Sequence, residues 1–516
     1  MKMVNEKSRY FLPSIAQFLF FTVSFVLSFS PWSKGLLNDG DTGYHIRAGE
    51  YILDTFSVPR HDIFSFLSPP IPWTAHEWLS EVIMALIHKV SGLTGVVIFF
   101  IFLISLIYTL LYKFIRKNQG NLFVDLIIIL LVIMTSQIHW LARPHIFSLL
   151  MMVFWYSILD AYQVNRLNYL FLLPPIMLLW VNLHGGFVAG FVLLGIYMGG
   201  NFLISVFQDS NKEKCREKMI RLGVVSFACL IVTLINPYGY HILGFPFKLV
   251  LNKEIMDNVS EFLSPNFHKF MPFKYLLLLL IAVLSVSRKQ LNAIEIVLLL
   301  TFISMSLYSV RYILLFAIVV APILSRQVGG IIANANQGSF LDRLEKKSND
   351  FSAIDERARC CLWAVVAVLV VISAALLGKI SFRFDETKKP VAAVEFLKTV
   401  GLQGNMYNHD EFGDYLIYAA YPEYRVFFDG RSDMYGSERV REYLKVAGFK
   451  AGWDNVIEKY EIRWVFFPSD STLSNALKQR EDWKLVYTDN VADIFLKNIP
   501  QYEKLIKRYG SSTSTF

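Results

Sequence analysis

Two carboxylates close to the first apolar segment are the clearest candidates for chemistry in this sequence. Asp39 and Asp41 lie two residues apart in the run LNDGDTGYHIRAGEY, and His45 follows in the same run. A carboxylate beside a substrate hydroxyl acts as a general base, and paired carboxylates also bind hard divalent cations. The pattern from Tyr44 to Phe56 predicts a helix, so Asp41 also fits the simpler role of a helix N-cap.

A second polar group begins at the sequence HEWLSE. Three residues are candidates for a second acid or for ligands of a divalent cation such as Mg²⁺ or Mn²⁺: Glu77, His76 and His45. Within residues 76–90, Glu81 and His88 fall on the same helical face as Glu77. This spacing predicts an amphipathic helix, which we expect to lie along the membrane interface.

The elements that position these residues are those of a membrane protein. Hydrophobic residues make up 54% of the 516 residues and charged residues 18%, whereas soluble domains carry about 25% charged residues. Eleven segments approach spanning length, and they cover residues 10–28, 95–112, 122–139, 144–162, 167–182, 186–206, 219–235, 274–287, 290–308, 312–326 and 361–378. The formal charge of +8 then reflects basic cytoplasmic loops, and we expect no nucleic-acid partner.

The excess of basic residues in cytoplasmic loops also predicts the orientation in the membrane. The basic stretch Met1 to Arg9 predicts a cytoplasmic N-terminus, and the absence of a convincing cleavage site makes the first segment a signal anchor. With segment 76–90 at the interface, five polar loops fall on the outer face: residues 38–75, 139–145, 182–186, 236–241 and 309–312. Loops held by a rigid scaffold often carry function, although turn formation alone would also explain their composition.

The composition changes after the last apolar segment. We expect a transmembrane domain over residues 1–380 with a first outer loop at 30–94, an exported α/β domain over 385–500, and a flexible tail over 501–516. Helix-like stretches cover residues 391–400, 437–446 and 473–480, and strand-like stretches cover 424–428, 464–467, 485–488 and 492–496. Asp429, Arg431 and Asp433 are candidates for binding an acceptor or sugar, and turn chemistry is the commoner explanation for them.

One motif resembles a known family. The pattern D-x-x-Y-H-x-R, formed by Asp41, Tyr44, His45 and Arg47, is similar to the first-loop motif of the polyprenol-phosphate-dependent GT-C glycosyltransferases, especially catalytic subunits of archaeal-type oligosaccharyltransferases. Protein O-mannosyltransferases and aminoarabinose transferases of bacterial lipid A are related enzymes. The resemblance implies a GT-C-like multispan α-helical fold with about eleven transmembrane helices, interfacial helices in the first outer loop and a C-terminal soluble α/β domain.

The resemblance also implies a reaction. A sugar would move from a polyprenyl-phosphate donor in the membrane lipid to an exported glycan, lipid or protein by inverting displacement, with Asp41 as the base and Asp39 beside it. The leaving phosphate needs positive charge and hydrogen-bond donors. The candidates for this contact are Arg311, Tyr312, Arg143, His145, His184 and His241. The expected location is the cytoplasmic membrane of a bacterium.

Simpler interpretations stand beside this one. Arg311 also fits an interfacial anchor whose charge reaches water, and a structural histidine explains His184 or His241 taken singly. A lipid-linked sugar transporter or flippase would use the same outer cations, but it would place ionisable residues within its spans. A non-catalytic scaffold for envelope polysaccharide assembly would leave Asp39 and Asp41 dispensable.

Overall fold

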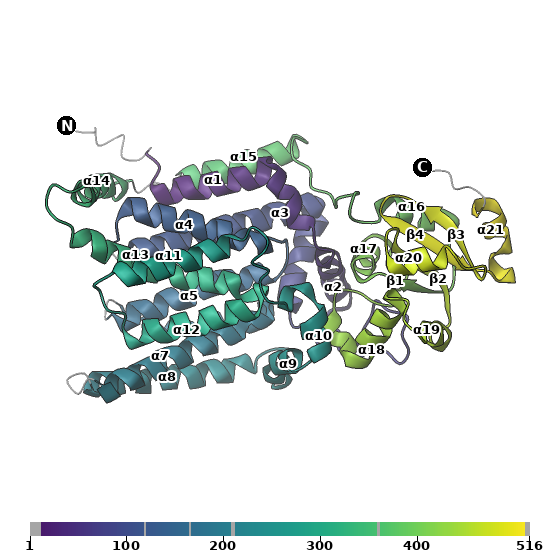
Figure 1. The fold of residues 1–516 in the computed structure, drawn as a ribbon, viewed down its shortest axis with the longest axis horizontal. Helices are drawn as coiled ribbons and strands as arrows, with labels where there is room; N and C mark the ends of the chain where they lie inside the picture. Colours follow the sequence, from purple (N-terminus) through teal and green to yellow (C-terminus); the bar gives the residue numbers. More distant parts are fainter. Residues whose placement is uncertain (1–11, 118–119, 165–166, 208–211, 359–361, 511–516) are drawn as a thin grey trace.

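The computed structural model describes residues 12–117, 120–164, 167–207, 212–358 and 362–510. A bundle of long helices makes up most of the molecule, and a smaller α/β region lies at one end of it (Figure 1). The basic residues from Met1 to Arg9, from which the cytoplasmic N-terminus was inferred, lie outside the described residues.

Each of the eleven expected apolar segments contains a helix. These helices are α1 (Ile15–Phe29), α3 (Trp78–Arg116), α4 (Leu122–Ser136), α5 (His145–Gln163), α6 (Leu173–Leu183), α7 (Val188–Phe207), α8 (Lys212–Thr233), α11 (Pro272–Val286), α12 (Ala293–Tyr308), α13 (Ile313–Ala333) and α15 (Leu362–Leu376). Among the described residues, five helices are long and apolar enough to cross a membrane, or six if α1 and the 3₁₀ helix η2 (Pro31–Leu37), bent by 79°, form one span. The chain is therefore an integral membrane protein, and the count of eleven spans stays a prediction.

Shorter helices and 3₁₀ turns connect the long helices of the bundle. They are α2 (Asp41–Thr55), α9 (His241–Val250), α10 (Lys253–Asn258) and α14 (Phe340–Asp355), with 3₁₀ turns η3 (Gln137–His139), η4 (Leu170–Leu172), η5 (Gly185–Phe187), η7 (Ser260–Phe262) and η8 (Val310–Tyr312). Of these, α2, α9 and α10 lie at the end of the bundle that faces the α/β region (Figure 1). The polar loops that we expected on one face begin or end at this same end.

The α/β region is built on a four-stranded mixed sheet. Its elements are α16 (Val391–Val400), β1 (Asn405–Asn408), α17 (Asp410–Ala420), α18 (Ser432–Ala447), α19 (Trp453–Lys459), β2 (Ile462–Pro468), α20 (Thr472–Leu477), β3 (Trp483–Thr488), β4 (Ala492–Lys497), η9 (Pro500–Tyr502) and α21 (Glu503–Tyr509). The strand order is β1-β2-β4-β3, with β1 parallel to β2 and the other pairs antiparallel. Helix α21 occupies the first half of the expected flexible tail, and residues 511–516 lie outside the described residues.

Helix α3 combines two segments that the sequence treats separately. The expected interfacial segment and the following span are two helical stretches that meet at a break at Gly92, whose φ of 62° lies in the left-handed region. The polar face of the first half packs inside the protein, because Glu81 is 1% exposed and His88 contacts Glu50 of α2 at 3.3 Å, and the expected place of this segment at the membrane interface stays a prediction. The amphipathic pattern therefore marks a contact between α3 and α2.

Helix α2 lies between α3 and α17, and glycines allow both contacts. A Cβ at Gly49 would collide with the backbone of Glu81 on α3, and a Cβ at Gly43 would approach the Cβ of Tyr418 on α17 to 2.7 Å. On the same side as Gly43, Arg47 donates from Nε and Nη2 to the carbonyl of Tyr418 at 2.9 and 2.7 Å. The helix that begins with Asp41 is thus shared by the bundle and the α/β region.

The first loop also joins the α/β region through a buried ion pair. Arg431 is 2% exposed, and its Nη2 lies 2.7 Å from Asp62 Oδ1 and 2.6 Å from Asp429 Oδ2. Its guanidinium lies 4.6 Å from the ring centroid of Trp73. Nearby, Val426 donates its backbone N–H to the carbonyl of Phe64 at 3.1 Å. Although burial opposes the shift, the Arg431 guanidinium lowers the pKa of Asp62.

We expect Arg431→Met to lower the free energy of unfolding by about 3–5 kcal/mol, because removing one partner of a buried ion pair leaves uncompensated charge. Thermal unfolding of the full-length protein in detergent would measure this effect, and limited proteolysis would show earlier cleavage between the bundle and the α/β region. Arg425→Met, at an exposed arginine six residues earlier, is the matched control. Equal stability of the two variants would contradict the assignment.

Candidate functional site

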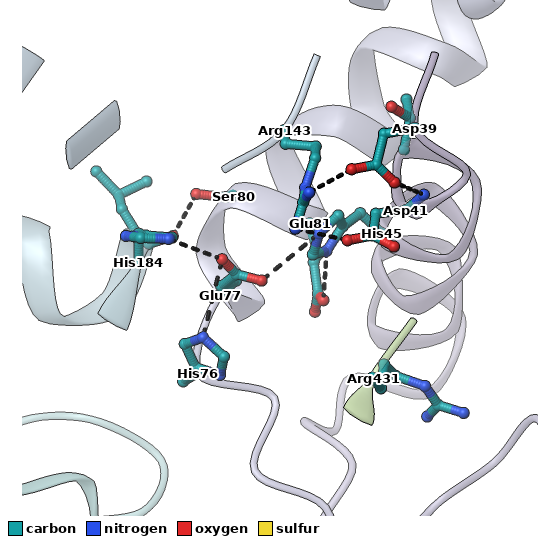
Figure 2. Close-up of polar contacts among 12 residues, drawn as sticks. Asp39, Asp41, His45, His76, Glu77, Ser80, Glu81, Arg143, His184 and Arg431 are labelled. Carbon is teal, nitrogen blue, oxygen red and sulfur yellow. Dashed lines mark hydrogen bonds and ion pairs between the residues drawn. The ribbon is translucent and has the colours of Figure 1, made fainter. Parts of the chain in front are cut away.

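Arg143, in the turn before α5, is the centre of the charged cluster that includes both expected carboxylates. Its guanidinium forms ion pairs with Asp39, with Asp41 (Nη2 to Oδ2, 2.5 Å) and with Glu261 of η7 (Nη1 to Oε1, 2.9 Å). The first loop, the turn before α5 and the segment before α11 therefore meet at one side chain. Figure 2 shows Arg143 beside Asp39 and Asp41 at the start of α2.

Asp41 is the first residue of α2 rather than its cap. Its backbone N–H donates to Asp39 Oδ1 at 3.0 Å, so Asp39 satisfies a free donor at the start of the helix. The Asp41 side chain is 10% exposed. Burial raises its pKa well above the usual value, although the Arg143 guanidinium opposes this shift. A carboxylate with a raised pKa is a stronger proton acceptor once ionised.

Glu261 has the opposite electrostatic character. The Arg143 guanidinium holds the pKa of Glu261 well below its usual range, which keeps this carboxylate ionised and makes it a weak base. Two carboxylates on the same arginine thus have pKa values shifted in opposite directions.

A cavity of about 100 Å³ lies next to this cluster. Five of the six residues expected to contact a phosphate line it: Arg143, His145, His184, Arg311 and Tyr312. They come from three separate loops, as the predicted convergence requires. The sixth, His241, is exposed at the start of α9 beside Tyr240 and does not line the cavity. Asp41 is not among the lining residues either, and it reaches the cavity only through Arg143.

Arg311 differs from Arg143 in its partners. Its guanidinium lies 5.3 Å from the ring centroid of Phe262. No acidic residue in the described parts of the chain forms an ion pair with it, whereas Arg143 has three such partners. The charge of Arg311 is therefore available to an anion in the cavity.

Three histidines surround Glu77, which precedes α3. Its carboxylate lies 3.5 Å from His45 Nε2, 3.3 Å from His184 Nε2 and 3.8 Å from His76 Nε2 (Figure 2). On the other side of the His45 ring, Nδ1 lies 3.1 Å from Glu81 Oε1. The predicted set of His45, His76 and Glu77 is therefore brought together, and burial raises the pKa of Glu77.

The tautomer of His184 follows from its neighbours. Gly186 donates its backbone N–H to His184 Nδ1 at 2.8 Å, so Nδ1 is an acceptor and the proton of the neutral ring is on Nε2, which faces Glu77. Burial lowers the pKa of His184 well below its usual value, and the neutral form follows. His184 therefore links the cavity to Glu77.

The α/β region covers Asp41 from the other side. Asp414 of α17 accepts the backbone N–H of Gly430 at 2.9 Å. A Cβ at Gly430 would collide with Asp41 Oδ1 and lie 2.9 Å from Asp414 Oδ2. Burial raises the pKa of Asp414 well above its usual value, and the nearby charges of Asp41 and Asp429 raise it further.

The structure separates the three residues expected to bind an acceptor or a sugar. Asp429 and Arg431 are paired and buried at the contact with the first loop, which gives them a structural part there. Figure 2 shows Arg431 apart from the histidine cluster. Asp433 is partly exposed, burial raises its pKa, and the charge of His76 opposes that shift. Only Asp433 thus remains next to the cluster.

Three residues of this site were missing from the expected set: Glu261, Glu81 and Ser148, whose Oγ lies 2.7 Å from His184 Nδ1. Glu81 had a visible signal, because it shares a helical face with Glu77. Asp414 lies in the acidic run NHDEFGDY, but nothing in that run points to Asp41. Glu261 and Ser148 carry no local signal, since a single glutamate in a connecting segment and a serine in an apolar helix are both common.

Two groups of residues could hold a divalent cation, and only the group of His45, Glu77 and Glu81 fits one. At Asp39 and Asp41, one oxygen of each carboxylate and one oxygen of Glu261 face the Arg143 guanidinium, so a cation already neutralises them. At His45, Glu77 and Glu81, one ligand atom from each residue lies within 4.8 Å of the others. A nitrogen and two carboxylate oxygens at this spacing match the donors of many protein metal sites.

Comparison with known proteins places the fold. The sequence matches no protein-family model and no curated protein. Among solved structures, the chain is similar to the oligosaccharyltransferase AglB of Archaeoglobus fulgidus in complex with an inhibitory peptide and a dolichol-phosphate, with 12% identity, a TM-score of 0.57 and coverage of 95% of this chain and 74% of that one. The apo form of the oligosaccharyltransferase from that organism gives a TM-score of 0.53 at 12% identity, over 88% and 69% of the two chains.

A third likeness is weaker. ArnT from Cupriavidus metallidurans bound to undecaprenyl phosphate is 10% identical, with a TM-score of 0.49 over 93% of this chain and 97% of that one. The oligosaccharyltransferase structures confirm the expected resemblance at the level of the fold. The chain is a membrane protein with the GT-C fold and a C-terminal region that contains a β-sheet.

We expect Arg143→Gln to destabilise the protein most strongly near neutral pH. In the wild type the pKa of Glu261 is lowered, so its contribution to stability is complete above its unfolded value near 4.5 and is lost as the pH falls through the folded value. Without the guanidinium this contribution disappears, and about 3–5 kcal/mol is the expected cost at pH 7.

Thermal unfolding between pH 2 and pH 8 would measure the effect. The difference in melting temperature between wild type and Arg143→Gln should stay constant above about pH 5 and shrink as the pH falls below about 4.5. Arg60→Gln, at an exposed arginine whose side chain donates to the carbonyl of Pro237, controls for general loss of charge. A difference independent of pH would contradict the electrostatic role.

Proposed function

We propose that this protein is a membrane glycosyltransferase that moves a sugar from a polyprenyl-phosphate donor to an exported acceptor. The observation that carries the proposal is the convergence of Arg143, His184 and Arg311 on one cavity beside Asp41. The shared fold with an oligosaccharyltransferase supports the same class of reaction. The protein would act in the cytoplasmic membrane of a bacterium, with its N-terminus in the cytosol and its α/β region outside.

The proposed step is an inverting displacement. An acceptor hydroxyl or amide attacks the anomeric carbon and gives its proton to the carboxylate of Asp41, while the bond from that carbon to the phosphate oxygen breaks. The electron pair leaves with the polyprenyl phosphate. Arg311 and the hydrogen-bond donors of the cavity stabilise the phosphate charge. The raised pKa of Asp41 supports its role as the base, and the lowered pKa of Glu261 counts against that residue.

The cavity sets a limit on this scheme. At about 100 Å³ it is smaller than the roughly 300–1,000 Å³ of typical small-molecule sites, which suits a phosphate headgroup better than a complete lipid-linked sugar. Because Gly430 and Arg143 cover Asp41 on two sides, the acceptor reaches the base only if one of them moves. The α/β region would then control access of the acceptor.

We expect Asp41→Asn to reduce sugar transfer by roughly 10²- to 10⁴-fold, the range typical for loss of a general base. Transfer would be measured with the purified protein and a panel of polyprenyl-phosphate sugars, using candidate glycan, lipid and peptide acceptors. Asp54→Asn, at an exposed position of the same helix, is the matched control.

Full activity of Asp41→Asn would exclude Asp41 as the base. Movement of the lipid-linked sugar across vesicles without transfer would instead favour a transporter.

Because the activity of Asp41 requires its ionised form, and burial raises its pKa, the wild-type rate should increase with pH through a midpoint above the usual aspartate value near 4.

A separate prediction concerns the donor phosphate. Arg311→Gln should raise the KM for the donor by roughly 10- to 100-fold, because a hydrogen bond to a charged group contributes about 1.5–3 kcal/mol. Steady-state kinetics with varied donor at saturating acceptor would show the change. Arg288→Gln, at an exposed arginine between α11 and α12, serves as the control, and an unchanged KM would remove Arg311 from the phosphate site.

A further inference from the structure

A buried carboxylate oxygen without a partner lies beside the histidine cluster. Glu81 is 1% exposed, its Oε1 lies 3.1 Å from His45 Nδ1, and its Oε2 has no hydrogen-bond partner among the described residues. A buried oxygen of a carboxylate is costly to leave unpaired. A bound group that is not part of the protein chain would therefore pair with Glu81 Oε2.

Neighbouring donors point to the nature of that group. One ring nitrogen of His45 and one oxygen each of Glu77 and Glu81 lie within 4.8 Å of one another. Ligands of a transition metal at about 2.0–2.2 Å are separated by about 3–4 Å, so the carboxylates need to move only slightly. The donors come from α2 and from the start of α3, which glycine packing at Gly49 holds in contact.

We propose that His45, Glu77 and Glu81 form a binding site for a divalent transition metal, separate from Asp39 and Asp41. A mixed set of imidazole and carboxylate donors favours Zn²⁺, and also Mn²⁺, over Mg²⁺ and Ca²⁺, which prefer oxygen ligands. The site does not depend on the proposed function, because its ligands are not the residues assigned to proton or phosphate transfer.

His184 has a positioning role in this site. Its Nδ1 accepts the Gly186 N–H, so the proton of the neutral ring is on Nε2, which lies 3.3 Å from Glu77 Oε1. A partner of this kind orients a ligating carboxylate, and its loss typically weakens metal binding by about 10- to 100-fold.

The test measures metal binding by the full-length protein in detergent, without any sugar donor or acceptor. Protein stripped with a chelator would be dialysed separately against Zn²⁺, Mn²⁺ and Mg²⁺, and bound metal would be counted by elemental analysis and titrated by calorimetry. We expect one Zn²⁺ per chain, weaker binding of Mn²⁺ and no competition from Mg²⁺ at about hundredfold excess. Bound Zn²⁺ should also raise the melting temperature, since it binds only the folded state.

Variants separate this site from adventitious binding. Glu81→Gln and Glu77→Gln should lose the bound Zn²⁺, and His184→Gln should keep the stoichiometry but bind about 10- to 100-fold more weakly. His88→Gln is the matched control, because His88 pairs with Glu50 at 3.3 Å between the same two helices and should bind Zn²⁺ normally. Melting curves in chelator establish that each variant is folded.

Absence of Zn²⁺ binding by the wild type, or equal binding by the two glutamate variants, would overturn the site. So would equal loss in His88→Gln. Because no transfer is measured, this proposal can fail while Asp41-dependent glycosyl transfer stands, and the reverse is also true.

Discussion

The buried guanidinium of Arg143 is the interaction on which the arrangement of the site depends. Three carboxylates, Asp39, Asp41 and Glu261, converge on it from two distant stretches of sequence. Carboxylates this close repel one another, and their burial is tolerated only with a compensating cation. The same ion pairs hold together the start of α2, the turn before α5 and η7, and of these Arg143 and Glu261 line the cavity. The Arg143 ion pairs therefore determine both the positions of these segments and the electrostatics of the three carboxylates.

Helix α2 extends this constraint to the α/β region. Gly49 allows α3 to pack closely on one side of α2, and Gly43 allows α17 to pack closely on the other side. Gly430 can lie against Asp41 because glycine has no Cβ that would collide with the carboxylate. The C-terminal region consequently packs against Asp41, since Gly430 lies against both Asp41 and Asp414 and the charge of Asp41 raises the pKa of Asp414. A movement of this region would change both the exposure and the pKa of Asp41.

Local sequence patterns predicted much of the fold, but they did not predict the elements that depend on pairing between residues far apart in the sequence. The apolar segments contain the helices, and residues 391–400 form α16 as expected, because hydrophobicity and periodicity are local properties. Residues 424–428 were expected to be a strand, but they make only an isolated bridge from Val426 to Ser65 of the first loop. The buried aromatic residues there pack at an interface. Strand β1 was missed because NMYN has little strand character and becomes a strand only by pairing with β2.

The same limit applies to the two-aspartate motif. Two acidic residues at the start of a loop indicate that a positive charge is needed, but the sequence does not say whether a metal or a side chain supplies it. Here Arg143, about a hundred residues away, supplies that charge. A guanidinium can orient a base and neutralise its neighbours, but it has no open coordination position for a substrate oxygen. The unpaired oxygen of Glu81 lies at the histidine cluster instead. Arg143 thus supplies the positive charge beside Asp39 and Asp41, whereas the neighbouring cluster of His45, Glu77 and Glu81 is the proposed metal site.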